Sequence, residues 1–237
     1  MALLEIRHLS KFFGGLAANA DVSFSVERGT IVGLVGPNGA GKTTLFDCVT
    51  GFHRPDRGEV RFRGIRINGL SPARVCRLGL ARTWQKVRPL ARLSVLDNVV
   101  VGALTRTRRV EAARDLAREE LRVVGLSDRA GVAAGTLPVG ERKKLELARA
   151  LATGPELLLV DEVLGGLNPT ESEEVVEVLL ALRASGLTLL VIEHDMRAIM
   201  RISDRVVVLD SGEKLAEGTP AEVVEDREVV AAYLGEP

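Results

Sequence analysis

One glycine-rich segment constrains the fold more than any other part of this 237-residue chain. It fits the pattern GxxxxGK[ST], and its residues are Gly36, Pro37, Asn38, Gly39, Ala40, Gly41, Lys42, Thr43 and Thr44. The apolar run Thr30–Val35 before it predicts a strand, and Lys42–Gly51 after it predicts a helix. Strand, glycine-rich loop and helix in this order are the context in which the pattern binds phosphate. The segment therefore predicts an α/β fold with a phosphate-binding loop.

The residue types of this loop explain how it would hold a phosphate. Glycines let the backbone curl, so that successive N–H groups point inward at an anion. The N-terminus of the following helix adds about half a positive charge. Lys42 would place its ammonium on the β- and γ-phosphates, and the Thr43 hydroxyl would coordinate Mg²⁺. The loop thus predicts binding of a nucleoside triphosphate with Mg²⁺.

A pair of acids stands where it can complete such a site. The apolar run Leu157–Val160 predicts a buried strand, and Asp161 and Glu162 follow it directly. We expect Asp161 to hold Mg²⁺, directly or through water. Glu162 points to the opposite face, where it would polarise a water for attack on the γ-phosphate. The alternative is that the two acids are simply solvated at a strand end. The phosphate loop in the same chain disfavours this alternative.

The rest of the chain alternates short apolar runs with helical stretches, which predicts a mostly parallel, doubly wound core. We expect further strands at 3–8, 22–26, 59–63, 80–84, 187–192, 205–210 and 213–217. We expect further helices at 72–78, 95–103, 110–124, 141–152, 171–184 and 196–202, with two short helices at the end. Residues 71–154 are helix-rich and predict a subdomain inserted into a catalytic core of residues 1–70 and 155–237.

Composition argues against several classes of protein. Lys plus Arg and Asp plus Glu number 32 each, and a net charge of zero argues against nucleic acid as a partner. Cys48 and Cys76 stand without a CxxC pattern, so we expect reduced thiols in a cytoplasmic protein. No signal-peptide pattern opens the chain, and no apolar run reaches the roughly 20 residues that cross a bilayer. Any link to a membrane is therefore expected through a partner.

Two single residues complete a recognisable order of motifs. Gln85 follows the strand expected at 80–84, and His194 stands at the end of the strand that precedes the helix at 196–202. The order of phosphate loop, Gln85, a signature-like helix start, acidic pair and His194 resembles the nucleotide-binding subunits of ABC transporters. Within that family the chain looks most similar to the ATP-binding proteins of branched-chain amino-acid transport systems. The segments that carry this closer resemblance are 82–85, 166–171, 191–196 and 232–236.

The resemblance covers residues 1–237 as one ABC ATPase cassette. It implies the fold of P-loop NTPases: a RecA-like, mostly parallel core with an N-terminal antiparallel β part and an inserted helical subdomain. It implies ATP and Mg²⁺ as ligands and a head-to-tail dimer, either a homodimer or a heterodimer with a second ATPase subunit. Integral-membrane permease subunits would bind near Gln85 and the segment 86–99, and a substrate-binding protein would take part indirectly. The chain would then lie on the inner face of the cell membrane.

The resemblance also implies roles for single residues. Phe13 would stack on adenine, and Gln85 would contact Mg²⁺ and sense the permease. Glu162 would be the general base, and His194 would contact the γ-phosphate. The loop Gly166–Asn168 would touch the partner subunit.

The signature segment departs from the usual Leu-Ser-Gly-Gly-Gln of the family. Here the residues that would contact the partner's ATP are Pro138, Val139, Gly140 and Glu141. Pro138 replaces the Ser whose hydroxyl would reach the γ-phosphate, and losing one neutral hydrogen bond costs about 0.5–1.5 kcal/mol. We therefore expect slower hydrolysis, with Gly140 kept where the backbone approaches the phosphate and Glu141 facing solvent.

The motifs leave the cargo open, because the ATPase never touches it. Import of branched-chain amino acids is the first hypothesis, and import of urea or short amides or export of lipopolysaccharide would use similar motifs. A non-transport ABC ATPase is the second, and the single cassette without a heptad run argues against it. A regulatory module that no longer hydrolyses ATP is the third. The altered signature argues mildly for that module. Four intact residues argue against it: Lys42, Asp161, Glu162 and His194.

Overall fold

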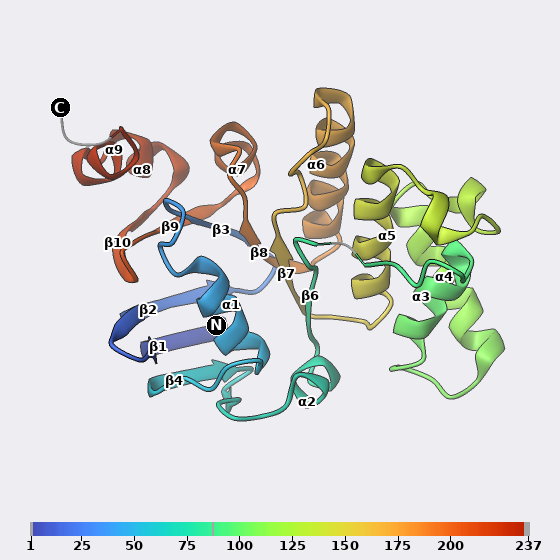
Figure 1. Cartoon of the computed structure of the whole chain (residues 1–237), viewed down its shortest axis with the longest axis horizontal. Coiled ribbons are helices and arrows are strands. Elements are labelled where there is room, and N and C mark those ends of the chain that lie inside the picture. The colour runs from blue at the N-terminus through green and yellow to red at the C-terminus, as the bar shows by residue number, and fades with distance from the viewer. Residues whose placement is uncertain (1, 87, 235–237) are drawn as a thin grey trace.

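The computed structural model describes residues 2–86 and 88–234, and two sheets organise this part of the chain (Figure 1). A four-stranded sheet has the order β2-β1-β4-β5, and a six-stranded sheet has the order β10-β9-β3-β8-β7-β6 within the described residues. The strands are β1 (Ala2–Phe13), β2 (Leu16–Glu27), β3 (Ile31–Val35), β4 (Arg57–Phe62), β5 (Ile65–Arg66), β6 (Leu80–Arg82), β7 (Leu157–Asp161), β8 (Thr188–Ile192), β9 (Arg205–Asp210) and β10 (Glu213–Gly218).

Helices cover the larger sheet and form an arm beside it. They are α1 (Lys42–Thr50), α2 (Pro72–Arg77), α3 (Val95–Ala103), α4 (Val110–Val123), α5 (Val139–Leu151), α6 (Pro169–Ala184), α7 (Met196–Ile202), α8 (Pro220–Glu225) and α9 (Arg227–Leu234). Two 3₁₀ turns, Ser127–Arg129 and Ala134–Thr136, lie between α4 and α5. Over the residues that the structure describes, no helix is both long enough and apolar enough to cross a bilayer.

The larger sheet confirms the predicted parallel core. Strands β9, β3, β8, β7 and β6 run parallel, and β10 pairs antiparallel with β9. All residues of β3, β7 and β8 are buried, as expected for a parallel sheet that is covered on both faces. Alternate side chains of one strand therefore enter two different cores. Leu157 and Leu159 pack toward α1 and the small sheet, whereas Leu158 and Val160 pack toward the other helices.

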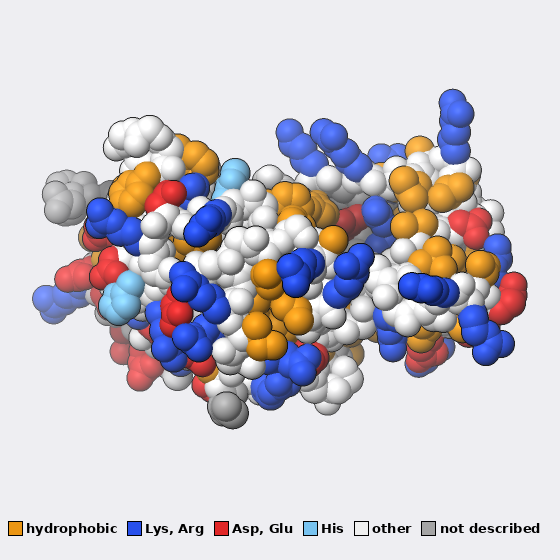
Figure 2. All heavy atoms as spheres, turned by 90° about the horizontal axis from the view of Figure 1, so that it is seen from below, with side chains coloured by type: hydrophobic (Ala, Val, Ile, Leu, Met, Phe, Trp, Pro, Cys, Tyr) orange, Lys and Arg blue, Asp and Glu red, His pale blue; other side chains and the backbone are white. Residues whose placement is uncertain are grey.

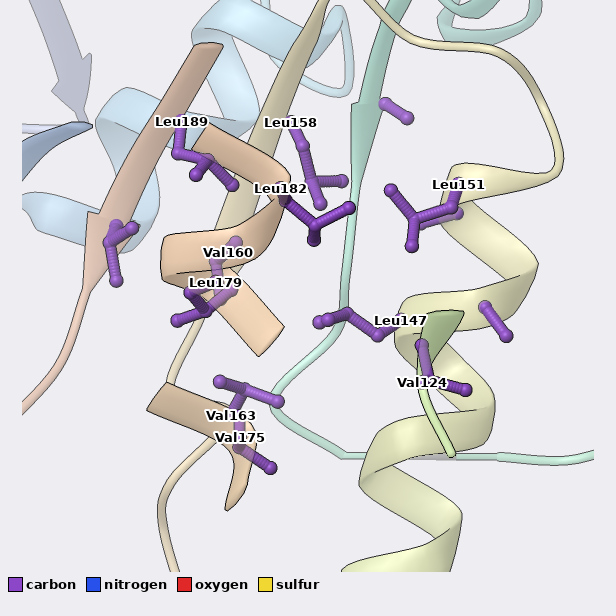
Figure 3. Packing of buried hydrophobic residues seen from close by; sticks show 14 of the residues in the cluster. Val124, Leu147, Leu151, Leu158, Val160, Val163, Val175, Leu179, Leu182 and Leu189 are labelled. Carbon is purple, nitrogen blue, oxygen red and sulfur yellow. The ribbon is translucent and has the colours of Figure 1, made fainter. Parts of the chain in front are cut away.

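Helix α5 joins the helical arm to this second core. In Figure 3, Leu147 and Leu151 of α5 point toward the space between β7 and α6, where Leu158 of β7 and Leu182 of α6 lie. In Figure 1, α3 and α4 lie beyond α5, away from the sheets. The predicted subdomain 71–154 contains this arm, but it also contains β6, which pairs with β7 in the core sheet.

Several predicted boundaries differ from those observed. β1 and β2 span 12 residues each, longer than 3–8 and 22–26, because they pair with each other antiparallel along their whole length. Register shifts interrupt this pairing, and His8 and Asp21 have positive φ angles of 50° and 53°. α5 begins at Val139, two residues before the predicted start. Val87, in the predicted docking segment, and residues 235–236 of the resembling tail lie outside the described residues.

Candidate nucleotide-binding site

The predicted phosphate loop connects β3 to α1, and its glycines adopt backbone angles that favour glycine. The φ angles of Gly36, Gly39 and Gly41 are 151°, 83° and 93°. A Cβ atom on Gly36 would lie 2.1 Å from the Leu209 backbone oxygen, and one on Gly41 would lie 2.2 Å from the Ala18 backbone oxygen. Both space and conformation therefore require glycine at 36 and 41.

Lys42 is buried, and its ammonium lies across the curled loop. Its Nζ donates to the carbonyl oxygens of Gly36 at 2.6 Å and Pro37 at 2.8 Å. Burial lowers the pKa of Lys42, while the nearby carboxylates of Glu162 and Asp161 oppose this change. A cation fixed at the loop can bind an anionic phosphate, and the two acids lie near this cation.

The two acids at the end of β7, Asp161 and Glu162, line different cavities. Asp161 lines a cavity of about 530 Å³ together with Thr43 and Gln85. Glu162 lines another cavity of about 560 Å³, whose further lining includes Phe13, Asn38, Gly39, Ala40, Gly41, Lys42, Thr43, Thr44 and His194. Thr43 borders both cavities, so the phosphate loop lies between the two carboxylates.

The predicted catalytic residues meet at one carboxylate. Glu162 accepts a hydrogen bond from the Gln85 side-chain amide, and its Oε1 lies 2.9 Å from His194 Nε2. The backbone of Glu162 is left-handed, with φ of 48°, and its N–H donates to the Ile192 carbonyl at 2.9 Å. Gln85, Glu162 and His194 come from three separate segments, and the fold brings all three together.

The residues expected around Mg²⁺ fit that ion. Thr43, Gln85 and Asp161 offer hydroxyl, amide and carboxylate oxygens to one cavity, and Mg²⁺ prefers such oxygen ligands together with phosphates. Asp161 also accepts a hydrogen bond from Arg82 Nη2 at 2.6 Å. Burial raises the pKa of Asp161, and the Arg82 guanidinium opposes this by stabilising the charged form.

Phe13 lies where the nucleobase of a bound nucleotide could reach it. It ends β1, is half exposed, and lines the same cavity as the phosphate loop. Its ring meets the His53 ring edge to face at a centroid distance of 5.2 Å. An exposed aromatic face beside a phosphate-binding loop is suited to stacking on a nucleobase.

The signature residues lie apart from these cavities. Pro138 caps α5, and neither it nor Val139, Gly140 and Glu141 is among the described residues that line the two cavities around the phosphate loop. Glu141 was expected to face solvent, but it is half-buried and its Oε1 accepts a hydrogen bond from Arg129 Nε at 3.0 Å. The ion pair with Arg129 offsets the negative charge of Glu141, which would be unfavourable near the partner's γ-phosphate.

Three buried charged residues were missed by the sequence analysis. Arg82 binds both Asp161 and Asp47, and its guanidinium lies between the rings of Phe46 and Trp84. Lys143, on α5, donates to the Glu162 carbonyl oxygen. Glu193, directly after β8, accepts the Leu164 N–H. A charged residue inside an apolar run is the sequence signal that could have drawn attention to Arg82.

A groove opens on the surface beside the predicted docking segment. It has a volume of about 340 Å³. Val101 of α3 and Arg149 of α5 line it together with residues of α2, and so do Phe52, which follows α1, and Trp84, which follows β6. Phe52 and Trp84 pack edge to face at 4.9 Å, and both are exposed. Figure 2 shows hydrophobic side chains gathered near the middle of one face with Lys and Arg around them.

Comparisons with known proteins show which proteins this chain resembles. The ABC transporter family model matches residues 20–165, and the model of the branched-chain amino acid ATP-binding cassette transporter matches residues 213–237. The chain is 40% identical to the high-affinity branched-chain amino acid transport ATP-binding protein BraF of Pseudomonas aeruginosa, over 99% of this chain and 98% of that protein. A solved ATP-binding cassette of an ABC transporter in its ADP conformation is 32% identical, with a TM-score of 0.91 and full coverage of both chains. A dimeric bacterial ABC transporter cassette is 25% identical, with a TM-score of 0.83 over 92% of this chain and 98% of that one.

Proposed function

We propose that this chain, which belongs to the ABC transporter family as an ATP-hydrolysing subunit, powers the import of branched-chain amino acids across a membrane. The observation that best supports its catalytic mechanism is the Glu162 carboxylate, which meets Gln85 and His194 beside the phosphate loop. The proposed cargo is supported by the family model that matches residues 213–237 and by the similarity to BraF.

The nucleotide would be held by the loop and its neighbours. Backbone N–H groups of residues 38–44 and the Lys42 ammonium would bind the β- and γ-phosphates, and Phe13 would stack on adenine. Thr43, Gln85 and Asp161 would hold Mg²⁺, which when bound neutralises charge on the phosphate oxygens.

Hydrolysis would depend on Glu162 and its two partners. The Glu162 carboxylate would accept a proton from a water that attacks the γ-phosphate in line. Gln85 and His194 hold the two carboxylate oxygens, so that the acid has one orientation before the nucleotide arrives. His194, half exposed in the same cavity, would contact the γ-phosphate.

A second subunit would complete the site. The signature residues Pro138, Val139, Gly140 and Glu141 lie outside the loop cavities of their own chain, and Pro138 and Val139 are exposed, so this helix start would face the ATP of a head-to-tail partner. The N-terminus of α5 would then cover the γ-phosphate and exclude water. The loop Gly166–Asn168 would contact the partner, which is either a second copy of this chain or a similar ATPase.

The permease would occupy the groove lined by Phe52, Trp84, Val101 and Arg149. The groove is lined mostly by apolar side chains, together with Arg82, Glu146 and Arg149, which suits a short amphipathic helix from a membrane protein. A chain docked there would lie on the inner face of the membrane, and the substrate-binding protein would act through the permease. Urea or amide import, lipopolysaccharide export and a non-transport role remain alternatives that transport measurements separate.

The test combines hydrolysis with transport. The chain is reconstituted in proteoliposomes with its permease subunits and binding protein, and uptake of leucine and of urea is measured with and without ATP. We expect ATP-dependent uptake of leucine alone. Glu162→Gln should lower ATPase activity at least about a hundredfold while ADP affinity is retained.

Glu177→Gln is the matched control, because Glu177 is an exposed glutamate on α6 that pairs with Arg201. Equal activity of the Glu162 and Glu177 variants would contradict the role of Glu162. Uptake of urea in place of leucine would contradict the proposed cargo.

A further inference from the structure

Lys143 is a buried cation that the proposed reaction does not use. It lies in the second turn of α5 and is 7% exposed. Its Nζ donates to the carbonyl oxygen of Glu162 at 2.7 Å and to that of Gln85 at 3.3 Å. One ammonium on the helical arm therefore holds the backbones of two residues whose side chains meet at the nucleotide site.

The backbone of Glu162 needs such support. Its left-handed φ of 48° is unfavourable for a residue that carries a Cβ, and it persists only where neighbours determine it. The N–H of Glu162 is tied to β8 through the Ile192 carbonyl, and its C=O is tied to α5 through Lys143. These two bonds together set the direction in which the Glu162 side chain leaves the backbone.

Acidic groups from several elements surround the buried Lys143. Burial lowers the pKa of Lys143, while the carboxylates of Glu193, Glu162, Asp161 and Glu146 oppose this change. Glu193 is itself fixed, because its Oε1 accepts the Leu164 N–H at 2.7 Å. The acids come from β7, from the end of β8 and from α5, so the ammonium lies where these elements meet.

We propose that Lys143 is a positioning residue that fixes Glu162 for hydrolysis and makes that geometry depend on the position of α5. The inference rests on the proposed function, in which Glu162 is the general base. α5 starts at the exposed Val139, in the segment that would face the partner's ATP, and Lys143 follows one turn later. A shift of α5 therefore moves the carbonyl group of Glu162, and ATP bound in one site alters the catalytic acid of the other.

Lys143→Met tests this, and Lys144→Met is the matched control. Lys144 is the next residue of α5, its side chain is 16% exposed, and it pairs with Glu174. Each variant is assayed in the full transporter for the kcat and KM of ATP hydrolysis. The isolated chain is assayed for ADP affinity by calorimetry, for melting temperature, and for amide hydrogen exchange of residues 161–165.

Lys143→Met should lower kcat at least thirtyfold, with KM and ADP affinity within threefold of wild type and faster exchange at 161–165. Lys144→Met should match wild type in all of these measurements. Lys143→Arg should have a kcat at least tenfold higher than that of Lys143→Met. Should Lys143→Met fail to fold, Lys143→Gln is used, because its amide keeps a donor while the charge is lost; we expect at least a tenfold fall in kcat.

Two outcomes would overturn the inference. One is a wild-type kcat in Lys143→Met or Lys143→Gln. The other is a parallel loss of kcat, ADP affinity and melting temperature that Lys143→Arg does not reverse, which would mean a purely structural role. Failure of the proposed role of Glu162 looks different, because Glu162→Gln would then hydrolyse ATP as fast as the Glu177→Gln control.

Discussion

Three buried cations converge on the two acids at the end of β7. Arg82 binds Asp161, and Lys143 binds the backbone of Glu162. Lys42 lies across the phosphate loop and interacts electrostatically with both acids. Adjacent carboxylates in a buried site repel each other and would also repel a triphosphate. Fixed cations offset this repulsion, which explains how two acids and a highly charged ligand can share one small region.

Glu193 gives a prediction about pH. Burial raises the pKa of Glu193 to about 7, although the Leu164 N–H and Lys143 favour its charged form. Because the folded chain holds this proton more tightly than the unfolded chain, the contribution of Glu193 to stability is complete below its ordinary pKa of 4.5 and is lost as pH rises through 7. Glu193→Gln removes the titration and keeps an acceptor for Leu164.

The free energy of unfolding of wild type, taken relative to Glu193→Gln, should therefore fall by on the order of 2–3 kcal/mol between pH 5 and pH 8. Urea unfolding at several pH values measures it. Titrating groups that do not interact with Glu193 occur unchanged in both proteins and cancel in the difference. A difference that stays constant over this pH range would show that Glu193 does not titrate there.

At the residue level, the motifs predicted which side chains meet, but they did not predict what supports them. Lys143 shares the buried face of α5 with Gly140 and Leu147, at helical spacings of three and four, so its burial was predictable from sequence. Its partners are backbone carbonyls 58 and 19 residues away. No local pattern signals such partners, because only the tertiary fold brings them together.

At the level of elements, α6 begins with a reciprocal cap. The Asn168 side chain accepts the Glu171 N–H at 2.9 Å, and the Glu171 carboxylate accepts the Asn168 N–H at 3.0 Å. Asn168→Ala should lower the free energy of unfolding by about 1 kcal/mol, whereas Asn168→Asp should change it by only a few tenths. Thermal and urea unfolding measure both; equal stabilities of the two variants would contradict the cap.

Element lengths were less predictable than element types. The buried strands β7 and β8 match their predicted cores closely, since continuous apolar runs mark them. β1 and β2 extend well beyond their apolar runs, because ladder bonds to each other continue through polar residues and bulges. α5 starts two residues before its predicted start, with Pro138 at the N-cap position, where its missing N–H costs no helical hydrogen bond.

At the level of the molecule, α5 connects the surfaces that the proposed cycle uses. Its start would face the partner's ATP, Lys143 holds Glu162, and Glu146 and Arg149 line the groove beside α2 and α3. These points span about 15 Å along one helix, at about 1.5 Å per residue. Arg82 and Trp84 line both the groove and the cavity that contains Asp161. A segment docked in the groove therefore touches residues that also contact the catalytic core.

Docking in this groove can be separated from folding by one substitution and its control. Val101 is 46% exposed on α3 within the groove, and Val110 is 53% exposed at the start of α4 and is not among the described residues that line it. A glutamate at either position stays in water, so both variants should melt within a few degrees of wild type. Inside the groove, however, docking would bury the new carboxylate among apolar side chains, which disfavours binding strongly. Val101→Glu should therefore lower co-purification with the permease at least tenfold, whereas Val110→Glu should not; equal recovery of both would place the permease on another surface.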